Sequence, residues 1–216
     1  LQSFRAQYRL GLTATPDRRD GLGFALPWFL GPLAAVVTRR RTKLSVIWLD
    51  GATEVEPVMN RRGELCYAST ITVLITDVER NQKIVAAVKR GLDQGRQIIV
   101  ISERRQQLKT LCELVGQGAL YVGETTKNGK SQRDALAKTA NPLFSSYAMG
   151  EEGLDVPRLD MLVFASPRGS PGCIEQCIGR IMRTAPDKYP PVVVDFKDNI
   201  FRSMQAERRR LYKKLT

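Results

Sequence analysis

The order of apolar segments in this chain of 216 residues predicts a doubly wound α/β fold, in which helices cover both faces of a parallel sheet. Two observations support this prediction. Short, continuous, β-branched runs such as Gln97–Ser102 (QIIVIS) are typical of strands that are buried on both faces. Between such runs lie segments whose apolar residues repeat every three to four positions, as in amphipathic helices. Strands that alternate with helices form right-handed βαβ units, which build a parallel sheet.

The predicted elements follow one another from residue 44 to the C-terminus. The predicted strands are Leu44–Leu49, Thr70–Thr76, Gln97–Ser102, Ala119–Val122, Leu143–Tyr147, Met161–Ala165 and Pro191–Phe196. The predicted helices are a segment after Asp77, then Arg104–Leu114, Ser131–Lys138, Pro171–Arg183 and a charged C-terminal segment. Asp77 suits the N-cap of the first helix because its carboxylate can accept a hydrogen bond from a free backbone N–H, and Gly95 is expected to end that helix.

Residues 1–43 fit this alternation less well. Tyr8–Leu12 is strand-like and is followed by a Thr-rich turn and a loop rich in Gly and Pro. We therefore expect residues 1–43 to be the end of a preceding domain plus a linker. Residues 44–200 are expected to form the α/β domain, and residues 201–216 a basic C-terminal helix.

The charge balance favours a polyanionic partner. The chain has 34 Lys and Arg against 22 Asp and Glu, a formal charge of +12, which favours nucleic acid. Single clusters such as Arg208–Arg210 are each typical of a solvated surface. No apolar run reaches the roughly 20 residues that a membrane helix needs.

The residues that usually bind metal ions are scarce. The chain has no histidine, and its four cysteines do not complete a zinc set, so no bound metal is expected within it. We expect the cysteines to be reduced thiols of an intracellular protein.

One predicted helix has a polar face that could bind a ligand. Gln176, Arg180 and Arg183 fall at positions i, i+4 and i+7, so they share one side of the helix, opposite to an apolar side. Gly179 lies between them and would allow a ligand or another domain to approach closely. Taken alone, the segment is equally well explained as an amphipathic surface helix with ordinary arginines.

Two further motifs lie near predicted strand ends. Gly153–Pro157 (GLDVP) follows the strand at Leu143–Tyr147, and the ends of parallel strands are where doubly wound sheets bind ligands. The alternative is a tight turn in which Asp155 caps a short helix. Leu12–Pro16 (LTATP) could equally be a strand that runs into a proline turn, with the Thr hydroxyls bonded locally.

Together these motifs resemble those of superfamily 2 helicases, in matching order and spacing over the whole chain. LTATP resembles motif III of this superfamily, and IIVISERRQQL resembles motif IV. SSYAMGEEGLDVP resembles motif V, and QCIGRIMR resembles motif VI. The segments YVGETT and PPVVVDFKDNIF also resemble the transcript-release DNA helicases of poxviruses and their relatives in other large DNA viruses and phages. This resemblance implies a RecA-like fold and the C-terminal half of an ATP-dependent DNA helicase or translocase.

The resemblance also implies roles at an ATP site between two RecA-like domains. It makes Arg180 and Arg183 arginine fingers on the γ-phosphate, and Arg183 the more direct of the two. Gln176 would orient water or couple the domains. The remaining implied roles are ribose binding by Gly153 and Asp155, and coupling of hydrolysis to strand movement by Thr13 and Thr15.

Nucleic acid would cross the carboxyl ends of the strands. The residues implied to hold its backbone phosphates are Ser102, Arg104, Gly123 and Ser146, with Arg105 either another contact or simply solvated. Relatives usually have Thr where Ser146 stands, and the hydroxyl is kept. The partner is expected to be single-stranded or duplex DNA.

Two essential motifs of such motors are missing from the chain. It contains no G-x-x-x-x-G-K-[ST] loop and no Asp-Glu box before LTATP. We expect both, and with them the Mg²⁺ ligands, in an upstream RecA-like domain, and we expect this chain alone not to hydrolyse ATP.

Three other readings remain open: an RNA helicase, a translocase that does not separate strands, and a non-catalytic nucleic-acid or protein-binding module. An upstream phosphate loop would restore the enzyme, and an unwinding assay would separate helicase from translocase. The segment Asp50–Ser69 carries no interpretable motif, and it could be a hairpin insertion or a family-specific contact surface.

Overall fold

The computed structural model describes residues 8–12, 22–35, 43–51, 55–123, 129–152 and 154–216. Contacts divide the chain into two units, residues 1–40 and 41–216. In the first unit, a short 3₁₀ turn, Leu22–Ala25, leads into helix α1, Leu26–Leu30. Tyr8–Leu12, which we predicted to be strand-like, has no regular structure, because a strand needs a partner and none pairs with it among the described residues.

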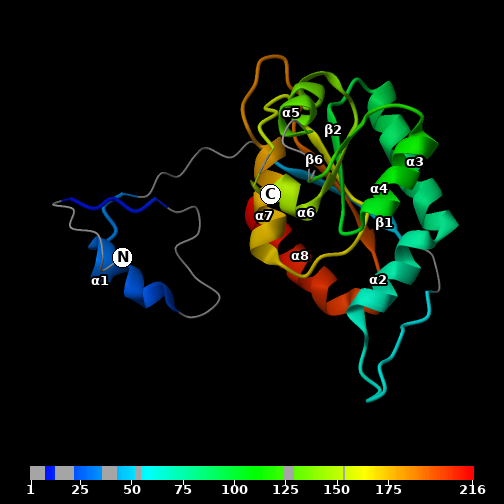
Figure 1. Ribbon diagram of the computed structural model, residues 1–216, viewed down its shortest axis with the longest axis horizontal. Helices are drawn as coiled ribbons and strands as arrows, with labels where there is room; N and C mark the ends of the chain where they lie inside the picture. The colour runs from blue at the N-terminus through cyan, green and yellow to red at the C-terminus, as the bar shows by residue number, and fades with distance from the viewer. Residues whose placement is uncertain (1–7, 13–21, 36–42, 52–54, 124–128, 153) are drawn as a thin grey trace. The chain divides into compact units, whose positions relative to one another are not determined.

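The second unit contains a parallel sheet of six strands in the order β1-β6-β5-β2-β4-β3 (Figure 1). The strands are β1 Ser45–Asp50, β2 Ile98–Ser102, β3 Ala119–Tyr121, β4 Leu143–Ser146, β5 Met161–Phe164 and β6 Val192–Lys197. All five strand pairs are parallel. The predicted doubly wound α/β fold is therefore confirmed.

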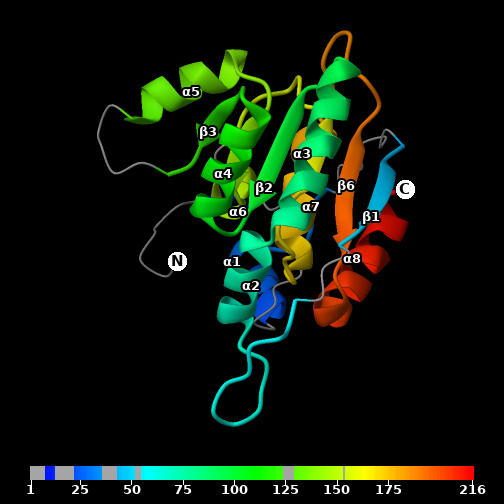
Figure 2. The same cartoon turned by 90° about the vertical axis from the view of Figure 1, so that its right-hand side faces the viewer.

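Helices cover both faces of the sheet, as Figure 2 shows. They are α2 Tyr67–Thr76, α3 Val78–Asp93, α4 Arg105–Val115, α5 Gly129–Thr139, α6 Tyr147–Glu152, α7 Pro171–Ile181 and α8 Arg202–Leu215. Apolar residues of α3 and α4 pack on one face, against alternate residues of the central strands. Residues of α6, α7 and α8 pack on the opposite face.

The predicted strand Thr70–Thr76 is wrong, because this segment forms helix α2. Its β-branched composition favoured a strand, but Ile71, Leu74 and Ile75 lie at helical spacing and are buried against Phe201. The threonine hydroxyls have hydrogen-bond partners, since that of Thr72 donates to the carbonyl of Ala68 at 2.9 Å and that of Thr70 accepts from the backbone N–H of Val58 at 3.0 Å. Tertiary burial therefore overrides the local preference for a strand.

The ends of α3 match the predicted ones, whereas helix α6 was not expected. Asp77 caps α3 as predicted, accepting from the backbone N–H of Arg80 at 2.6 Å, and Gly95 follows the end of α3 with a φ of +74°. The short helix α6 was not predicted, and Tyr147, which we assigned to a strand, is its first residue.

The segment between β1 and α2 contains a hairpin-like excursion that projects from the body of this unit (Figures 1 and 2). Met59 and Leu65 form an antiparallel bridge. Asn60 closes the turn between them, because its side-chain carbonyl accepts from the backbone N–H groups of Arg62 and Glu64 at 2.8 and 3.0 Å. The segment thus contains a tight turn closed by one bridge, and a contact role for it stays a prediction.

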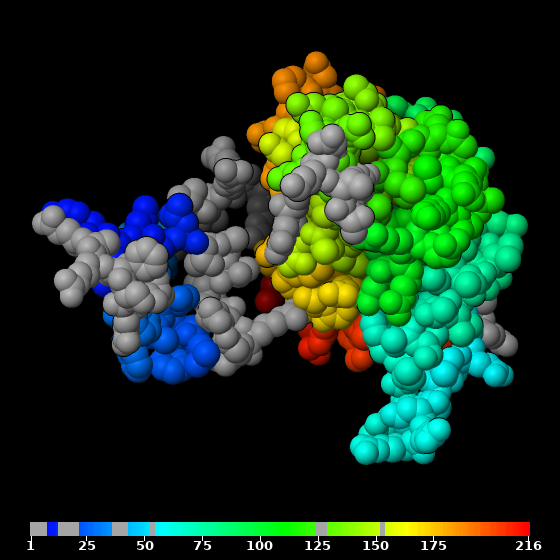
Figure 3. Space-filling model, viewed as in Figure 1, coloured from blue at the N-terminus to red at the C-terminus, as the bar shows by residue number. Residues whose placement is uncertain are grey.

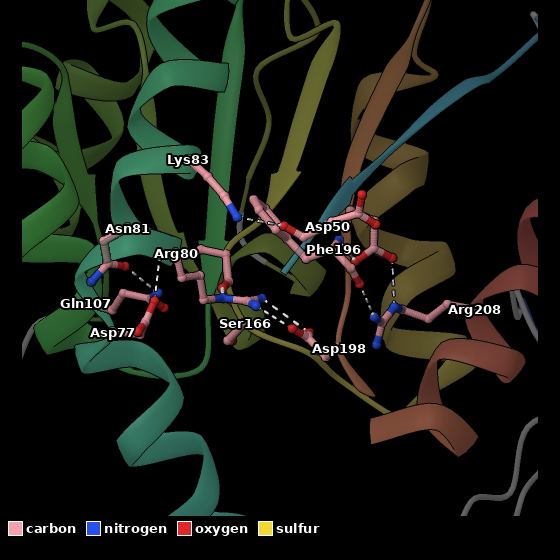
Figure 4. A network of polar contacts seen from close by, with 12 residues as sticks. Asp50, Asp77, Arg80, Asn81, Lys83, Gln107, Ser166, Phe196, Asp198 and Arg208 are labelled. Carbon is pink, nitrogen blue, oxygen red and sulfur yellow. Dashed lines mark hydrogen bonds and ion pairs between the residues drawn. The ribbon is translucent and has the colours of Figure 1, made fainter. Parts of the chain in front are cut away.

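A buried ion pair ties α3 to the carboxyl end of the sheet (Figure 4). The side chain of Arg80 is 1% exposed, forms a two-point pair with Asp198, and donates from Nε to the carbonyl of Ala165 at 3.0 Å. Its guanidinium also lies over the ring of Phe196, 4.6 Å from the centroid. Burial raises the pKa of Asp198, although the charge of Arg80 opposes this shift.

A second buried pair fastens the C-terminal helix. Arg208 donates from Nε to Asp195 at 2.7 Å, and the hydroxyl of Tyr212 donates to the same carboxylate oxygen at 2.7 Å. The sequence suggested that the cluster Arg208–Arg210 is solvated, but Arg208 is 2% exposed. Arg208 lies on the apolar side of α8, whereas Arg209 stacks on Trp48.

We predict that replacing only one partner of the first pair strongly destabilises the fold. Arg80→Met leaves the carboxylate of Asp198 buried without its partner, which should lower the free energy of unfolding by about 3–5 kcal/mol. Urea denaturation followed by circular dichroism measures this change. The double variant Arg80→Met/Asp198→Asn removes both charges and should recover part of the loss, and a double variant less stable than Arg80→Met alone would contradict the account.

Candidate functional site

Helix α7 presents one buried and one open face, as the sequence predicted. Ser170 caps the helix by accepting from the backbone N–H of Cys173 at 3.4 Å, and Pro171 occupies its first turn. The apolar residues Ile174, Cys177, Ile178 and Ile181 are fully buried. Gly179 is exposed, and a Cβ there would meet nothing within 4 Å. Figure 3, in which α7 is gold, shows part of this helix at the molecular surface.

Arg180 holds the end of α6 against α7. Its guanidinium donates to the backbone carbonyls of Gly150 and Leu154, each at 3.0 Å, and to that of Glu151. The last carbonyls of a helix have no partner within the helix, so a cation that binds three carbonyls there satisfies groups that would otherwise need water. Burial and the neighbouring charge of Arg183 lower the pKa of Arg180, but a guanidinium keeps its charge at any ordinary pH.

Gly150 lies where α6 packs on β2 and α7. A Cβ at Gly150 would lie 2.7 Å from Cδ1 of Ile101 and 3.5 Å from Sγ of Cys177. A larger residue would require the end of the Ile101 side chain to shift, whereas its distance to Cys177 would be an ordinary van der Waals contact.

Arg183 forms an ion pair with Asp155. This contact joins two of the motifs that the sequence singled out, because Asp155 follows α6 and Arg183 follows α7. The pair is open to solvent, with the Asp155 side chain 84% exposed and the Arg183 side chain 32% exposed. Exposed pairs of this kind contribute about 0–1 kcal/mol, so either partner can exchange it for a ligand at little cost.

The position of Asp155 differs from our expectation. We predicted the turn at Gly153–Pro157 to lie directly at the carboxyl end of a strand, but α6 separates Asp155 from β4. Asp155 therefore lies beside α7. Gly153, Thr13 and Thr15 fall outside the described residues. Gln176 is half-buried on the same helix as Arg180.

A second group of predicted residues lies at the carboxyl edge of the sheet. Ser102 and Ser146 are register partners at the ends of β2 and β4. Ser102 is fully buried, and its hydroxyl donates to Oε1 of Gln107 at 2.6 Å and accepts from the backbone N–H of Arg104 at 3.2 Å. Its hydroxyl therefore shapes the loop that carries Arg104. Ser146 is half-buried.

The two arginines after β2 differ in their surroundings. Arg104 donates from Nη2 to the carbonyl of Ala68 at 3.1 Å, and its buried Nε has no partner among the described residues. Arg105 is exposed and lies beside Gly123, where an added Cβ would be 3.4 Å from Nη2 of Arg105. The structure thus brings Arg105 and Gly123 together at this edge.

Arg168 is a candidate that our sequence reasoning missed. It follows β5, forms an ion pair with Glu103 at 3.4 Å and lies over the ring of Tyr147. Glu103 also accepts from the hydroxyl of Tyr67 at 2.7 Å, which connects α2 to this edge. The signal was available in the sequence, because SPRGS is a polar segment directly after a buried strand.

The described ranges hold no group of three or more side chains placed to bind a metal ion. Within the same ranges, no helix has both the length and the hydropathy to cross a bilayer. The groups that the structure brings together at the site are guanidiniums, an exposed carboxylate, hydroxyls and backbone groups. Such an arrangement suits the binding of phosphates.

Comparisons with known proteins agree with this arrangement. Residues 79–185 match the family described as helicase conserved C-terminal domain. A relative from Acanthamoeba polyphaga mimivirus is named as an ATP-dependent RNA helicase. It is 26% identical over an aligned length of 235 residues, gaps included, and the alignment covers 99% of this chain and 43% of that protein. A transcript termination protein of Yaba monkey tumor virus is 31% identical over 133 residues, which cover 58% of this chain and 28% of that protein.

The crystal structure of T4 UvsW has a similar fold, with a TM-score of 0.57 and 17% identity over 81% of this chain and 40% of that chain. The chain thus spans less than half the length of each of these proteins.

We predict that Arg180 and Arg183 contribute very differently to stability, although both are arginines of one motif. Arg180→Lys keeps the charge but cannot bind three carbonyls at once, so the free energy of unfolding should fall by about 1.5–3 kcal/mol. The matched control Arg183→Lys disturbs only an exposed ion pair. It should change the free energy of unfolding by less than about 0.5 kcal/mol. Urea denaturation of both variants measures these changes. Equal effects would contradict the role that we assign to Arg180 in holding α6 against α7.

Proposed function

We propose that this chain supplies the second motor domain of an ATP-dependent DNA helicase or translocase of superfamily 2, because residues 79–185 match the family described as helicase conserved C-terminal domain. One observation carries the proposal. Two separate motifs meet on the side of the fold formed by α6 and α7, because Arg183 pairs with Asp155 and Arg180 donates to the carbonyl of Leu154. The guanidinium of Arg183 and the exposed carboxylate of Asp155 are chemically suited to the phosphates and ribose of a nucleotide held by another domain.

In this proposal Arg183 is the catalytic arginine. Its guanidinium is paired with the exposed carboxylate of Asp155. When another motor domain brings ATP to this side, Arg183 exchanges the carboxylate for the γ-phosphate, and Asp155 becomes free to accept a hydrogen bond from a ribose hydroxyl. An inserted arginine stabilises the charge that spreads over the phosphoryl oxygens in the transition state and can contribute about 10³–10⁵ in rate.

Arg180 has a positioning role in this mechanism. Its guanidinium already donates hydrogen bonds to three backbone carbonyls, and Arg180 thereby fixes the loop that carries Asp155. The resemblance implied a direct γ-phosphate contact for Arg180, and the hydrogen bonds favour the indirect role. Gln176 would orient the attacking water or contact the other domain.

The phosphate-binding loop and the Mg²⁺ ligands belong, in this proposal, to an upstream domain. The chain contains no G-x-x-x-x-G-K-[ST] sequence. Mg²⁺ would neutralise charge on the β- and γ-phosphates. We accordingly propose that this chain alone does not hydrolyse ATP.

Nucleic acid is proposed to bind across the carboxyl edge of the sheet. The exposed guanidinium of Arg105, the backbone at Gly123, the hydroxyl of Ser146 and the side chain of Arg168 all lie at strand ends there. Such groups suit backbone phosphates, which makes binding blind to sequence and sensitive to salt. Ser102, which is fully buried, would act by positioning Arg104.

RNA is the second candidate substrate. The mimivirus relative is named as an RNA helicase. In contrast, the segments YVGETT and PPVVVDFKDNIF of this chain resemble those of DNA helicases. Comparing single-stranded DNA and RNA of one sequence in the same binding assay separates the two. Tighter binding of RNA and stimulation of ATP turnover by RNA alone would replace DNA in the proposal.

Two variants of the longer protein that contains this domain test the catalytic assignment. Arg183→Ala should lower kcat for ATP hydrolysis by about 10³-fold, because it removes transition-state stabilisation. The affinity for a fluorescent ATP analogue should change less than tenfold. Lys109→Ala, on the exposed side of α4, is the matched control and should leave kcat unchanged. Unchanged ATP turnover in Arg183→Ala, with nucleotide binding intact, would remove Arg183 from the catalytic role.

Salt dependence tests the proposed nucleic-acid surface. Each lost phosphate contact reduces the slope of log K against log salt by about 0.9 on duplex DNA and by about 0.7 on single strands. Arg105→Ala and Arg168→Ala should therefore each reduce the slope by about 0.7 on single strands. Fluorescence anisotropy with labelled oligonucleotides of two unrelated sequences measures the slope, and both sequences should weaken equally. Slopes that match the unsubstituted protein would place the nucleic acid elsewhere.

A further inference from the structure

Lys188 connects the two chain segments that meet at the proposed ATP site. Its Nζ donates to the backbone carbonyl of Arg183 at 2.6 Å and to that of Pro157 at 2.9 Å. Pro157 lies two residues after Asp155, the ion-pair partner of Arg183. One ammonium group therefore binds the backbone of both segments whose side chains form that pair. Lys188 itself lies outside the motifs that contain these residues.

The turn before Lys188 has an uncommon backbone conformation. Among the described residues, Asp187 is the only residue other than glycine with a positive φ, +53°. The left-handed region is unfavourable for residues with a side chain, and Asp and Asn tolerate it best. Such a conformation persists only where surrounding contacts hold it. The two hydrogen bonds of Lys188, the next residue, are contacts of this kind.

The ammonium group of Lys188 is partly withdrawn from water. Lys188 is half-buried, and this burial lowers its pKa. The charge of Asp160 opposes the shift, and that of Arg183 adds to it. Asp160 is itself paired with Arg96 at 3.4 Å. A charge that loses water needs hydrogen bonds in its place, and the two carbonyls provide them. Lys188 therefore links backbone segments and is not simply a solvated surface charge.

This link joins the segments in a way that the exposed ion pair cannot. The Arg183–Asp155 pair contributes only about 0–1 kcal/mol. In the proposed function Arg183 exchanges Asp155 for phosphate, after which these side chains no longer hold the segments together. The backbone contacts remain. Arg180 binds the loop just before Asp155, and Lys188 binds it just after. Lys188 also holds the backbone of Arg183.

We propose that Lys188 is a positioning residue for Arg183 and keeps its guanidinium aligned with the γ-phosphate after Asp155 has been released. This inference rests on the proposed function and adds a residue to it. Lys188 does not touch the nucleotide and acts only through Arg183. Because a displacement of about 1 Å can cost about 10²-fold in rate, loss of the link should lower kcat and leave nucleotide affinity nearly unchanged.

Variants of the longer protein that contains this domain test the proposal. Lys188→Met removes the ammonium group and should lower kcat for ATP hydrolysis at least tenfold, while the Kd of a fluorescent ATP analogue changes less than threefold. Lys188→Arg keeps several N–H donors and should retain more of kcat than Lys188→Met. The matched control is Lys83→Met on α3, since Lys83 is also half-buried and donates to the carbonyl of Asp50 at 3.3 Å. It should change kcat less than twofold.

A double-mutant cycle separates positioning from a general loss of stability. Lys188→Met should lower kcat at least tenfold when Arg183 is present, but less than twofold in the Arg183→Ala background. A purely structural role would lower kcat by the same factor in both backgrounds. If Lys188→Met does not fold, Lys188→Gln, which keeps an amide donor, provides the same comparison.

The outcomes distinguish this inference from the proposed function. If Arg183→Ala lowers kcat but Lys188→Met does not, or lowers it equally in both backgrounds, the positioning role is overturned and the proposed function stands. A Lys188→Met variant that weakens binding of the ATP analogue at least tenfold with kcat unchanged would make Lys188 a nucleotide contact and would also overturn it. If Arg183→Ala leaves ATP turnover unchanged, the proposed function fails and this inference fails with it.

Discussion

Buried guanidinium groups hold together the parts of this fold that the proposed site needs. Arg80 joins α3 to the segment after β6, and Arg208 joins α8 to β6 itself. Arg180, which is only half-buried, joins α6 to α7 by binding backbone carbonyls in place of a carboxylate. A buried charge must be fully paired, so these contacts are geometrically demanding, and they fix where each helix begins or ends relative to the sheet. The loops that carry candidate functional residues inherit their positions from these contacts.

This arrangement divides the arginines of a basic chain into two kinds. Those with buried partners fix helices and loops in place. Those at the surface, such as Arg105 and Arg183, are either solvated or held only by an exposed carboxylate, so they can exchange their partners for phosphate at little cost. Sequence spacing alone does not separate the two kinds, since Arg180 and Arg183 belong to the same motif and the same helical segment.

The parallel sheet could be predicted because strands buried on both faces leave an unmistakable run of apolar, β-branched residues. The same signal misled us at Thr70–Thr76, where the β-branched residues belong to a helix whose burial depends on Phe201, far away in the sequence. The open face of α7 was predictable from periodicity. The contacts of Arg180 were not, because its acceptors are backbone carbonyls that only the unpredicted helix α6 brings near. Pairs such as Arg80 and Asp198, 118 residues apart, leave no local pattern.

The central claim is that this domain completes an ATP site whose other half lies in a different motor domain. The most direct test compares ATP hydrolysis by this chain with that of the longer protein that we propose contains it, each with and without single-stranded DNA. The account predicts that this chain alone is inactive and that the longer protein hydrolyses ATP faster when DNA is present. A longer protein that binds DNA but hydrolyses no ATP under any of these conditions would contradict the account and would make this domain a nucleic-acid-binding module.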